Sequence, residues 1–545
     1  MKKFSLSALV FTFASAAALA QWSSNPALNL TLADRSGEQV QPKIRAATDG
    51  GAWVSWYDNS TGGYDVYIQR LDKTGVEQFA HNGVLLADRS VSSTVDYGLA
   101  VDANNNGLIA FTDDRGGQHV TAQKVSPAGA LMWNGINGVS LTPASTIGSP
   151  PQVAALTDGS SVVIWNGTTS PIGTWIQKLD ASGAPQFAGS GILQNDTQSP
   201  QRPLEACDVE PGDNGSFIVL FVRCTGTNCV TSNKQLYIQK YDASGAPQWN
   251  AGAPMALMLS TASIQTGTFP RFLPDGNGGA VVAWYETGGA RNALMQHVLA
   301  NGTLKFASPI SNVGPTNPAT RIRVGAGLAY NQSTGDYFVA SPETDGSTQS
   351  QNSLLVQRID STGALKWGDS GVTLLAITTL TQPAFVQSQI MDDSVVVYWE
   401  QTTSGTTRVV AAARVRTDAT VLWNELLASD GTKDKSRLDS AASACGYGMV
   451  AYGNGPSGSV DIQAQNVRQS GLLGNPPTPL GDMNCDGVVN AEDVAAFSIA
   501  LLDTAQFAAL YPCCTTSLAD MNGDLNINGG DINAFVQCVL GSCPP

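Results

Sequence analysis

Residues 175–187 read WIQKLDASGAPQF, and residues 237–249 read YIQKYDASGAPQW. Residues 67–79, YIQRLDKTGVEQF, follow the same order, with a central glutamine, a D-x-x-G turn and an aromatic residue ten positions after the glutamine. Short apolar runs bounded by Asp, Ser and Gly are typical of strands joined by tight turns. A motif that recurs along a chain predicts a repeat architecture. This motif therefore determines the fold class that we expect.

The glutamine marks eight repeat units along the chain. Seven units carry it, and Ala413 takes its place in the seventh unit: Gln69, Gln123, Gln177, Gln239, Gln296, Gln357 and Gln465. The spacings are 54, 54, 62, 57, 61, 56 and 52 residues. An average of about 57 residues leaves room for the four short strands of a propeller blade. We expect the repeated Gln, aromatic and D-x-x-G residues to be structural, since every blade must make the same turn and pack on its neighbour.

The aromatic residue of the motif occurs only seven times: Phe79, Trp133, Phe187, Trp249, Phe306, Trp367 and Trp423. The eighth unit ends near Gly474 without it. Residues 21–30, QWSSNPALNL, match residues 248–257, QWNAGAPMAL. The N-terminal segment is therefore expected to complete the last unit and close a ring, which removes exposed strand edges. We predict an all-β fold, a β-propeller over residues 21–474, with eight blades or, if a degenerate unit is miscounted, seven.

Charge and hydropathy restrict the cellular context. The chain has 545 residues with a net charge of −15, and it lacks a Lys/Arg cluster, which argues against a nucleic-acid partner. Residues 1–20 have two lysines, an apolar run and a final Ala-Leu-Ala, the pattern of a signal peptide. No other run is apolar and long enough to span a membrane. We predict a secreted, extracellular or cell-surface protein.

Nine cysteines in an exported protein predict disulfides, with at least one thiol left over. We expect Cys224 to pair with Cys229, Cys485 with Cys514, and Cys538 with Cys543. Cys207 and Cys445 lie in opposite blades of an eight-unit ring, so both are expected to be buried and unpaired.

The C-terminal region differs from the repeats. A Pro-rich linker over residues 475–480 precedes residues 481–545, which contain eight acidic residues and no Lys or Arg. Two loops of twelve residues there carry oxygen-bearing residues at positions 1, 3, 5, 7, 9 and 12. These are Asp482, Asn484, Asp486, Val488, Asn490 and Asp493, then Asp520, Asn522, Asp524, Asn526, Asn528 and Asp531. Ca²⁺ takes six to eight oxygen ligands, and this spacing predicts two Ca²⁺ sites in which position 7 contributes its backbone carbonyl.

A helical pattern with a matched Ala-Phe follows each loop. Residues 481–545 resemble a type I dockerin domain, a tandem EF-hand-like calcium module that docks enzymes onto cohesin domains. The resemblance implies Ca²⁺ as the cofactor and a cohesin-like or cell-surface protein as the partner. Leu525 replaces the glycine at position 6 that Gly487 provides in the first loop, so we expect strain in the second loop.

Two functions are compatible with this organisation. The first is a non-catalytic binding or scaffold propeller, with a glycan or protein ligand, that is docked or attached to a surface by its tail. The alternative is a polysaccharide-degrading enzyme, a glycoside hydrolase or lyase. Five acids that follow second strands are the candidates for a shared rim: Asp58, Asp113, Asp114, Glu286 and Glu400. A solvated loop is the plainer interpretation of these acids. The three histidines fit no metal or triad spacing and are expected on the surface or in loops. A channel lined by small, repeat-equivalent residues would favour the scaffold, and a cleft with two carboxylates would favour the enzyme.

Overall fold

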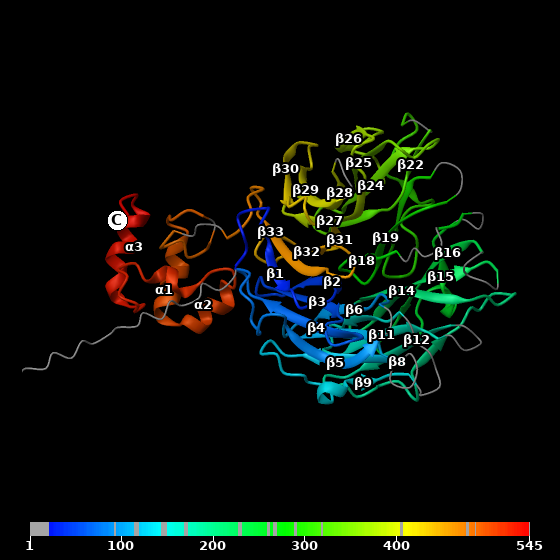
Figure 1. Ribbon diagram of the computed structural model, residues 1–545, viewed down its shortest axis with the longest axis horizontal. Helices are drawn as coiled ribbons and strands as arrows, with labels where there is room; N and C mark the ends of the chain where they lie inside the picture. The colour runs from blue at the N-terminus through cyan, green and yellow to red at the C-terminus, as the bar shows by residue number, and fades with distance from the viewer. Residues whose placement is uncertain are drawn as a thin grey trace, which may run out of the picture.

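The computed structural model describes residues 21–91, 94–113, 119–142, 150–167, 173–226, 232–258, 262–264, 270–287, 291–317, 320–403, 407–475, 479–485 and 487–543. These residues form eight antiparallel sheets and a small helical region at the C-terminal end. The predicted eight-bladed propeller is therefore confirmed (Figure 1). None of the helices in the described part of the chain combines the length and the apolar character needed to cross a membrane.

Each blade is one sheet whose strands follow each other outwards from the centre of the ring. The first four blades are β2 (Gln39–Ala46), β3 (Ala52–Asp58), β4 (Tyr64–Leu71) and β5 (Val84–Val91); β6 (Gly98–Val101), β7 (Gly107–Asp113), β8 (His119–Val125) and β9 (Val139–Ser140); β10 (Gln152–Ala155), β11 (Ser161–Asn166), β12 (Thr174–Leu179) and β13 (Ile192–Gln194); and β14 (Leu204–Pro211), β15 (Phe217–Cys224), β16 (Lys234–Tyr241) and β17 (Met255–Ala256).

Blades five to eight follow the same plan. They are β18 (Phe272–Pro274), β19 (Ala280–Tyr285), β20 (Ala293–Val298) and β21 (Ile310–Ser311); β22 (Arg321–Arg323) and β23 (Gly327–Asn331), which both pair with β24 (Asp336–Asp345), then β25 (Asn352–Ile359) and β26 (Val372–Thr378); β27 (Pro383–Met391), β28 (Ser394–Thr402), β29 (Arg408–Arg416) and β30 (Val421–Ala428); and β31 (Lys435–Ala442), β32 (Gly448–Asn454), β33 (Asp461–Val467) and β1 (Leu30–Ala33). The inner strands contact each other in ring order, and β2 contacts β31.

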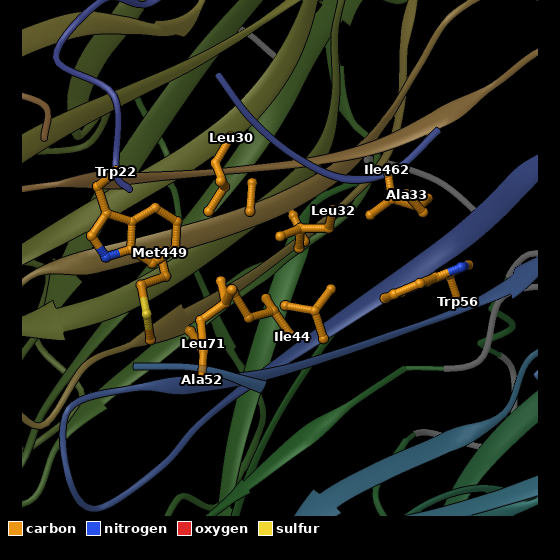
Figure 2. Close-up of a cluster of buried hydrophobic side chains, with 14 of the residues drawn as sticks. Trp22, Leu30, Leu32, Ala33, Ile44, Ala52, Trp56, Leu71, Met449 and Ile462 are labelled. Atoms are coloured by element: carbon orange, nitrogen blue, oxygen red, sulfur yellow. The ribbon is translucent and has the colours of Figure 1, made fainter. Parts of the chain in front are cut away.

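The N-terminal strand closes the ring, as the sequence match predicts. β1 is the outermost strand of blade eight and pairs antiparallel with β33. Trp22 takes the place of the missing aromatic, because its indole Nε1 donates to Lys73 O in blade one while Gln465 Nε2 donates to Ser23 O. Figure 2 shows Trp22, Leu30 and Leu32 packed against residues of both blades in one buried cluster. Apolar burial therefore joins the two ends of the propeller.

The repeated glutamine and aromatic residues form a band of identical contacts, which we call the belt. In blades one to six, the glutamine Oε1 accepts the backbone N–H of the aromatic residue, as Gln239 does from Trp249 at 2.8 Å. The amide Nε2 donates to carbonyl groups of the loop that follows, as Gln239 does to Trp249 O and Ala253 O. Blade seven has no glutamine because β30 is a full strand that pairs directly with β29, with Ala413 opposite Asn424. The belt is structural, as predicted.

The C-terminal region contains α1 (Asp493–Leu502), α2 (Thr504–Leu510) and α3 (Ile532–Val539), which lie to one side of the ring near β1 and β33 (Figure 1). The Cys445–Cys513 disulfide joins this region to blade eight. Lys73 of blade one donates to Pro512 O at 2.8 Å and to Cys514 O at 2.5 Å. The tail is therefore attached at the seam where the propeller closes.

Of the cysteine predictions, three are confirmed, one is wrong and one stays a prediction. Cys485–Cys514 and Cys538–Cys543 are disulfides, and Cys207 is buried and unpaired. The prediction that Cys445 is unpaired is wrong, because the tail, whose position the sequence does not reveal, brings Cys513 to it. The predicted partner of Cys224, Cys229, lies outside the described residues, as does the predicted signal peptide.

Candidate functional site

The inner strands surround a central channel that encloses about 1160 Å³. In every blade, the belt residue of the third strand pairs with a residue of the second strand, and that residue pairs in turn with one residue of the inner strand. In blade one these three residues are Gln69, Val54 and Ile44. The residue immediately before this inner-strand residue occupies an equivalent place in all eight blades: Lys43, Gly98, Gln152, Asp208, Arg271, Gly327, Gln387 and Asp439. These positions share a register but not a residue type.

Blade two departs from this set for a steric reason. A Cβ on Gly98 would lie 2.5 Å from Val153 N, so the position is restricted to glycine. Asp96, two residues earlier, supplies the polar side chain of this blade to the channel. We call Lys43, Asp96, Gln152, Asp208, Arg271, Gln387 and Asp439 together the channel ring; all of them line the channel.

Arg271 links four blades through its guanidinium group. It lies 2.7 Å from Asp96, 2.9 Å from Asp208 and 2.7 Å from Gln152. Lys43 adds a second cation on Asp96 at 2.7 Å. Burial disfavours ionisation of Asp96, but Lys43 and Arg271 outweigh it and hold the pKa of Asp96 well below its usual range. Asp96 is therefore a carboxylate at every pH at which the protein is expected to work.

Asp439 is the centre of a second network at the seam of the ring. Its carboxylate accepts from Arg45 at 2.8 Å, from Ile44 N at 2.9 Å and from Gln387 Nε2 at 3.1 Å. Burial raises the pKa of Asp439, whereas Arg45 and Lys43 lower it by more, so the net shift is downwards. Blades seven, eight and one are tied together by this single carboxylate.

Glu210 differs from the other carboxyl groups of the channel. It lies two residues after Asp208 on β14, and therefore on the same side of the strand. Burial, followed by the charge of Asp208, raises the pKa of Glu210 to about 8, although Arg45 and Arg271 act in the opposite direction. Glu210 is therefore protonated at neutral pH, beside an aspartate that forms an ion pair with Arg271. An acid and a carboxylate with different protonation states are the pattern of an acid–base site.

The acids proposed from the sequence do not form a shared rim. Asp58 and Asp113 are fully buried, and Glu286 accepts from Trp284 Nε1 within its own blade. Glu400 is also buried, and its Oε1 accepts from Leu438 N at 2.8 Å at the start of the next inner strand. Glu400 therefore lies between blades seven and eight and not on a rim of the channel. Asp114 lies outside the described residues.

The histidines were only partly anticipated. His81 is partly exposed beside Glu77 and Asp34, as expected for a surface residue. The expectation was wrong for His119 and His297, which are buried on β8 and β20. His297 lies between Asp275 and Tyr337, at 3.0 and 2.6 Å. Neither residue lines the channel.

The channel ring was missed because its members lie far apart in sequence and differ in type. A signal was present in the repeats: the position one residue before the middle of each inner strand carries charged or amide side chains in six of eight units. Alignment of the inner strands on the belt glutamines would have brought these residues into one column.

The two predicted calcium loops of the tail have the same backbone arrangement. The position-1 carboxylate accepts the position-6 N–H in both, from Gly487 to Asp482 and from Leu525 to Asp520, each at 3.0 Å. The position-12 carboxylates, Asp493 and Asp531, are fully buried. Each accepts the N–H groups of positions 2, 3 and 9 of its own loop.

The remaining predicted ligands are less enclosed. Val488 is 58% exposed, Asn522, Asn526 and Asn528 bond within their own loop, and Asp524 Oδ1 accepts from Asn526 N at 2.8 Å. Asn490 accepts from Glu492 N at 2.7 Å, and Asn484 bonds Asp493 through its backbone. Asp486 lies outside the described residues. Within the described ranges, no three His, Cys, Asp or Glu side chains are grouped as a metal site.

No family model and no curated protein matches the chain. Among solved structures, it is similar to a polysaccharide lyase, a PL25 ulvan lyase bound to a GlcA–Rha3S unit, with 10% identity, 82% of this chain and 95% of that chain covered, and a TM-score of 0.42. An α-L-arabinanase of Penicillium chrysogenum has 14% identity, coverages of 62% and 99%, and a TM-score of 0.35. The NanB sialidase of Streptococcus pneumoniae has 11% identity, coverages of 82% and 71%, and a TM-score of 0.33. At these identities and scores the likeness concerns the fold alone.

The leading functional interpretation from the sequence, a non-catalytic scaffold, is wrong. The residues that line the channel give the physical reason. A scaffold channel was expected to be lined by small, repeat-equivalent residues, whereas the lining of this channel also includes four carboxyl groups and four cations from five blades. The lining agrees better with the carboxylate-bearing cleft that the alternative interpretation expects.

Proposed function

We propose that the propeller degrades a polysaccharide in its central channel. The observation that carries this proposal is the pair of Glu210 and Asp208 on β14, in which one carboxyl group keeps its proton at neutral pH and the other is paired with Arg271. Cleavage of a glycosidic bond requires a proton for the leaving oxygen and a nearby carboxylate. Glu210 is the proposed general acid, and Asp208 is the carboxylate beside it.

The channel ring positions this pair. Arg271 is held by carboxylates from blades two and four, so the guanidinium group cannot turn towards Glu210 without the loss of two ion pairs. Glu210 therefore remains without a fixed cation and retains its proton. A preorganised polar environment of this kind is what a transition state with developing charge requires.

The test is release of reducing ends from a panel of polysaccharides by the full chain. Glu210→Gln is expected to lower the rate at least ~100-fold, because it removes the proton donor. Glu205→Gln is the matched control, since Glu205 lies on the same strand but does not line the channel. Equal activity of the two variants would remove Glu210 from the mechanism. Products that absorb in the ultraviolet would show elimination and assign the chain to the lyases instead of the hydrolases.

We further propose that the tail binds Ca²⁺ through its two dockerin-like loops. The specific observation is that both position-12 carboxylates are buried in a region with no Lys or Arg of its own, and that both loops already hold the position-1 and position-12 side chains in place. A bound Ca²⁺ would supply the missing positive charge and would cross-link each loop to its following helix.

Calorimetric titration of the chelator-treated full chain with Ca²⁺ tests the second proposal. Two binding events are expected, of which Asp493→Ala removes the first and Asp531→Ala the second. The Asn475→Ala variant, changed outside both loops, should bind as the parent does. The absence of binding heat at millimolar Ca²⁺ would overturn the proposal.

The disulfides of the tail support export. Three disulfides of the described residues hold the tail and its contact with blade eight, and such bonds persist in oxidising compartments. We propose that the protein acts outside the cell, where polymeric glycans are accessible. Detection of the mature chain in the medium, starting at Gln21, would support this location, and retention in the cytoplasm with reduced cysteines would contradict it.

A further inference from the structure

Three consecutive blades have the same irregularity at the start of their inner strands. The pairing register jumps between Ala384 and Gln387 in blade seven, between Ser436 and Asp439 in blade eight, and between Val40 and Lys43 in blade one. In each case the first inserted residue has a left-handed backbone: Phe385 at φ 50°, Arg437 at φ 59° and Gln41 at φ 54°. All three residues line the channel.

These conformations are unfavourable for residues with a side chain. A positive φ is tolerated by glycine and disfavoured for a bulky aromatic residue such as Phe385. Blades two, three and five make their inner strands without such a register shift, so the fold itself does not require one. Bulges next to binding sites serve to redirect a side chain. The three insertions redirect theirs to the mouth of the channel.

The side chains at this mouth are exposed and chemically complementary. The Phe385 ring is 41% exposed, although phenylalanine is usually buried. The Arg437 guanidinium carbon lies 5.8 Å from the centre of this ring. Lys43, Arg45 and Arg271 are each bound to an aspartate of the channel. Arg437, in contrast, forms no ion pair with any carboxylate in the described part of the chain.

We propose that Phe385 and Arg437 form a subsite for one anionic sugar residue at the mouth of the channel, with the apolar face of the sugar ring on Phe385 and its carboxylate or sulfate on Arg437. The subsite rests on the proposed function, because the sugar belongs to the polymer that the channel cleaves. A planar guanidinium group binds either anion with two parallel hydrogen bonds. The exposed ring supplies the apolar area that a sugar face can cover.

The subsite is separate from the proposed acid. Gln387 and Asp208 occupy equivalent positions of their inner strands, so Glu210 is equivalent to Gln389. Phe385 is then four residues away from the level of Glu210, one of them inserted by the bulge, or roughly 10 Å along the strand direction. The tail is attached at Cys445, after the inner strand of blade eight, and at Lys73 of blade one, which both lie at the opposite end of the blades from this mouth.

Binding is measured on the full chain with Glu210→Gln as the background, so that the polymer remains intact. The probes are polygalacturonate, dextran sulfate and neutral dextran. Phe385→Gly and Arg437→Met are each expected to weaken binding of one anionic probe ~10-fold, and Arg437→Met should also reduce the salt dependence of binding. The anionic probe with the higher affinity identifies the carboxylate or the sulfate. Leu380→Ala is the control, because Leu380 is 65% exposed but does not line the channel.

The Phe385→Gly variant keeps the test independent of folding. Glycine adopts a positive φ without strain, so this variant should unfold at a higher temperature than its parent while it binds more weakly. If Phe385 served only the fold, Phe385→Gly would lower the unfolding temperature and leave binding of the probe unchanged. Unchanged binding by both variants, an equal loss in Leu380→Ala, or stronger binding of neutral dextran would overturn the subsite.

The two proposals fail in different ways. Loss of binding in the variants, together with an inactive parent that retains Glu210, would sustain the subsite and overturn the enzyme. Normal cleavage by the parent with unchanged binding in the variants would sustain the enzyme and overturn the subsite.

Discussion

The belt and the channel ring occupy equivalent positions in the blades, but only the belt keeps the same residue. Seven blades use a glutamine at the belt position, and six of these glutamines receive the N–H of an aromatic residue ten positions later. Apart from Asp96, which lies two residues earlier, the channel ring has a lysine, an arginine, aspartates and glutamines at one register. The same residue occurs where every blade must make the same structural contact. Different residues at equivalent positions indicate a function that the ring performs only once.

The largest effect is expected from pH on the channel. The pKa of Glu210 is raised to about 8 in the folded state, above its unfolded value near 4.5, so the folded protein holds a proton that the unfolded chain loses. The free energy of unfolding should therefore fall as pH rises from about 5 to about 8, by up to ~1.4 kcal/mol per pH unit. Urea unfolding at several pH values measures this slope, and Glu210→Gln should make it shallower, while Glu400, whose pKa burial raises to about 7, contributes equally in both proteins.

The difference between parent and Glu210→Gln isolates this group. The pKa of His81 is also raised above its ordinary value, against the effect of burial, by its bonds to Glu77 and Asp34. Its contribution to stability is likewise lost as pH rises, but it is the same in both proteins and cancels. If the two slopes agree, Glu210 does not titrate near neutral pH and the contrast between channel and belt loses its main support.

The belt should respond to truncation with a loss of stability alone. Gln239 is fully buried and accepts from Trp249 N and Lys240 N while it donates to Trp249 O and Ala253 O. Gln239→Ala leaves these groups unpaired and should lower the free energy of unfolding by ~2–4 kcal/mol. Gln248→Ala, at an exposed side chain of the same turn, should change it by less than ~0.5 kcal/mol. A specific loss of ligand binding in Gln239→Ala at unchanged stability would contradict the division of tasks.

Blade seven provides the converse test. Ala413 is fully buried and faces a strand that pairs without a belt. Ala413→Gln restores the common residue but inserts an amide into a filled space, so it should lower the free energy of unfolding by ~1–3 kcal/mol. Thermal unfolding of the full chain is sufficient to measure this change. A gain in stability would show that the glutamine is favourable wherever the repeat occurs, independent of the outer strand.

The same division explains what the sequence predicted. The eight blades, the closing strand and two disulfides could be predicted because each depends on a local pattern or on a match between two segments. The channel could not, since Lys43 and Asp96, or Arg271 and Asp208, meet only through closure of the ring. The Cys445–Cys513 bond was missed for the same reason, because it depends on where the tail binds.

The tail shows the contrast between repeated and divergent positions on a smaller scale. Its two loops agree at positions 1 and 12 and differ at position 6, where Gly487 has φ 93° and Leu525 has φ 65°. Leu525 is 92% exposed, so its side chain contributes little packing that could offset the left-handed backbone. The second loop therefore carries strain that the first loop avoids.

Leu525→Gly should remove this strain. Relief of a left-handed conformation is worth ~1–2 kcal/mol, and the greater freedom of glycine in the unfolded chain offsets ~0.4–1 kcal/mol of it. A net gain of ~0.5–1 kcal/mol is expected in the stability of the tail, with a matching increase in the Ca²⁺ affinity of the second loop, since the chain no longer has to be strained to hold the ligands. Gly487→Ala, at the equivalent position of the first loop, should lower the stability of the tail and the Ca²⁺ affinity of the first loop. Opposite signs in calcium titration of the two variants would attribute the difference between the loops to position 6, whereas a loss of affinity in both would show that Leu525 makes a contact of its own.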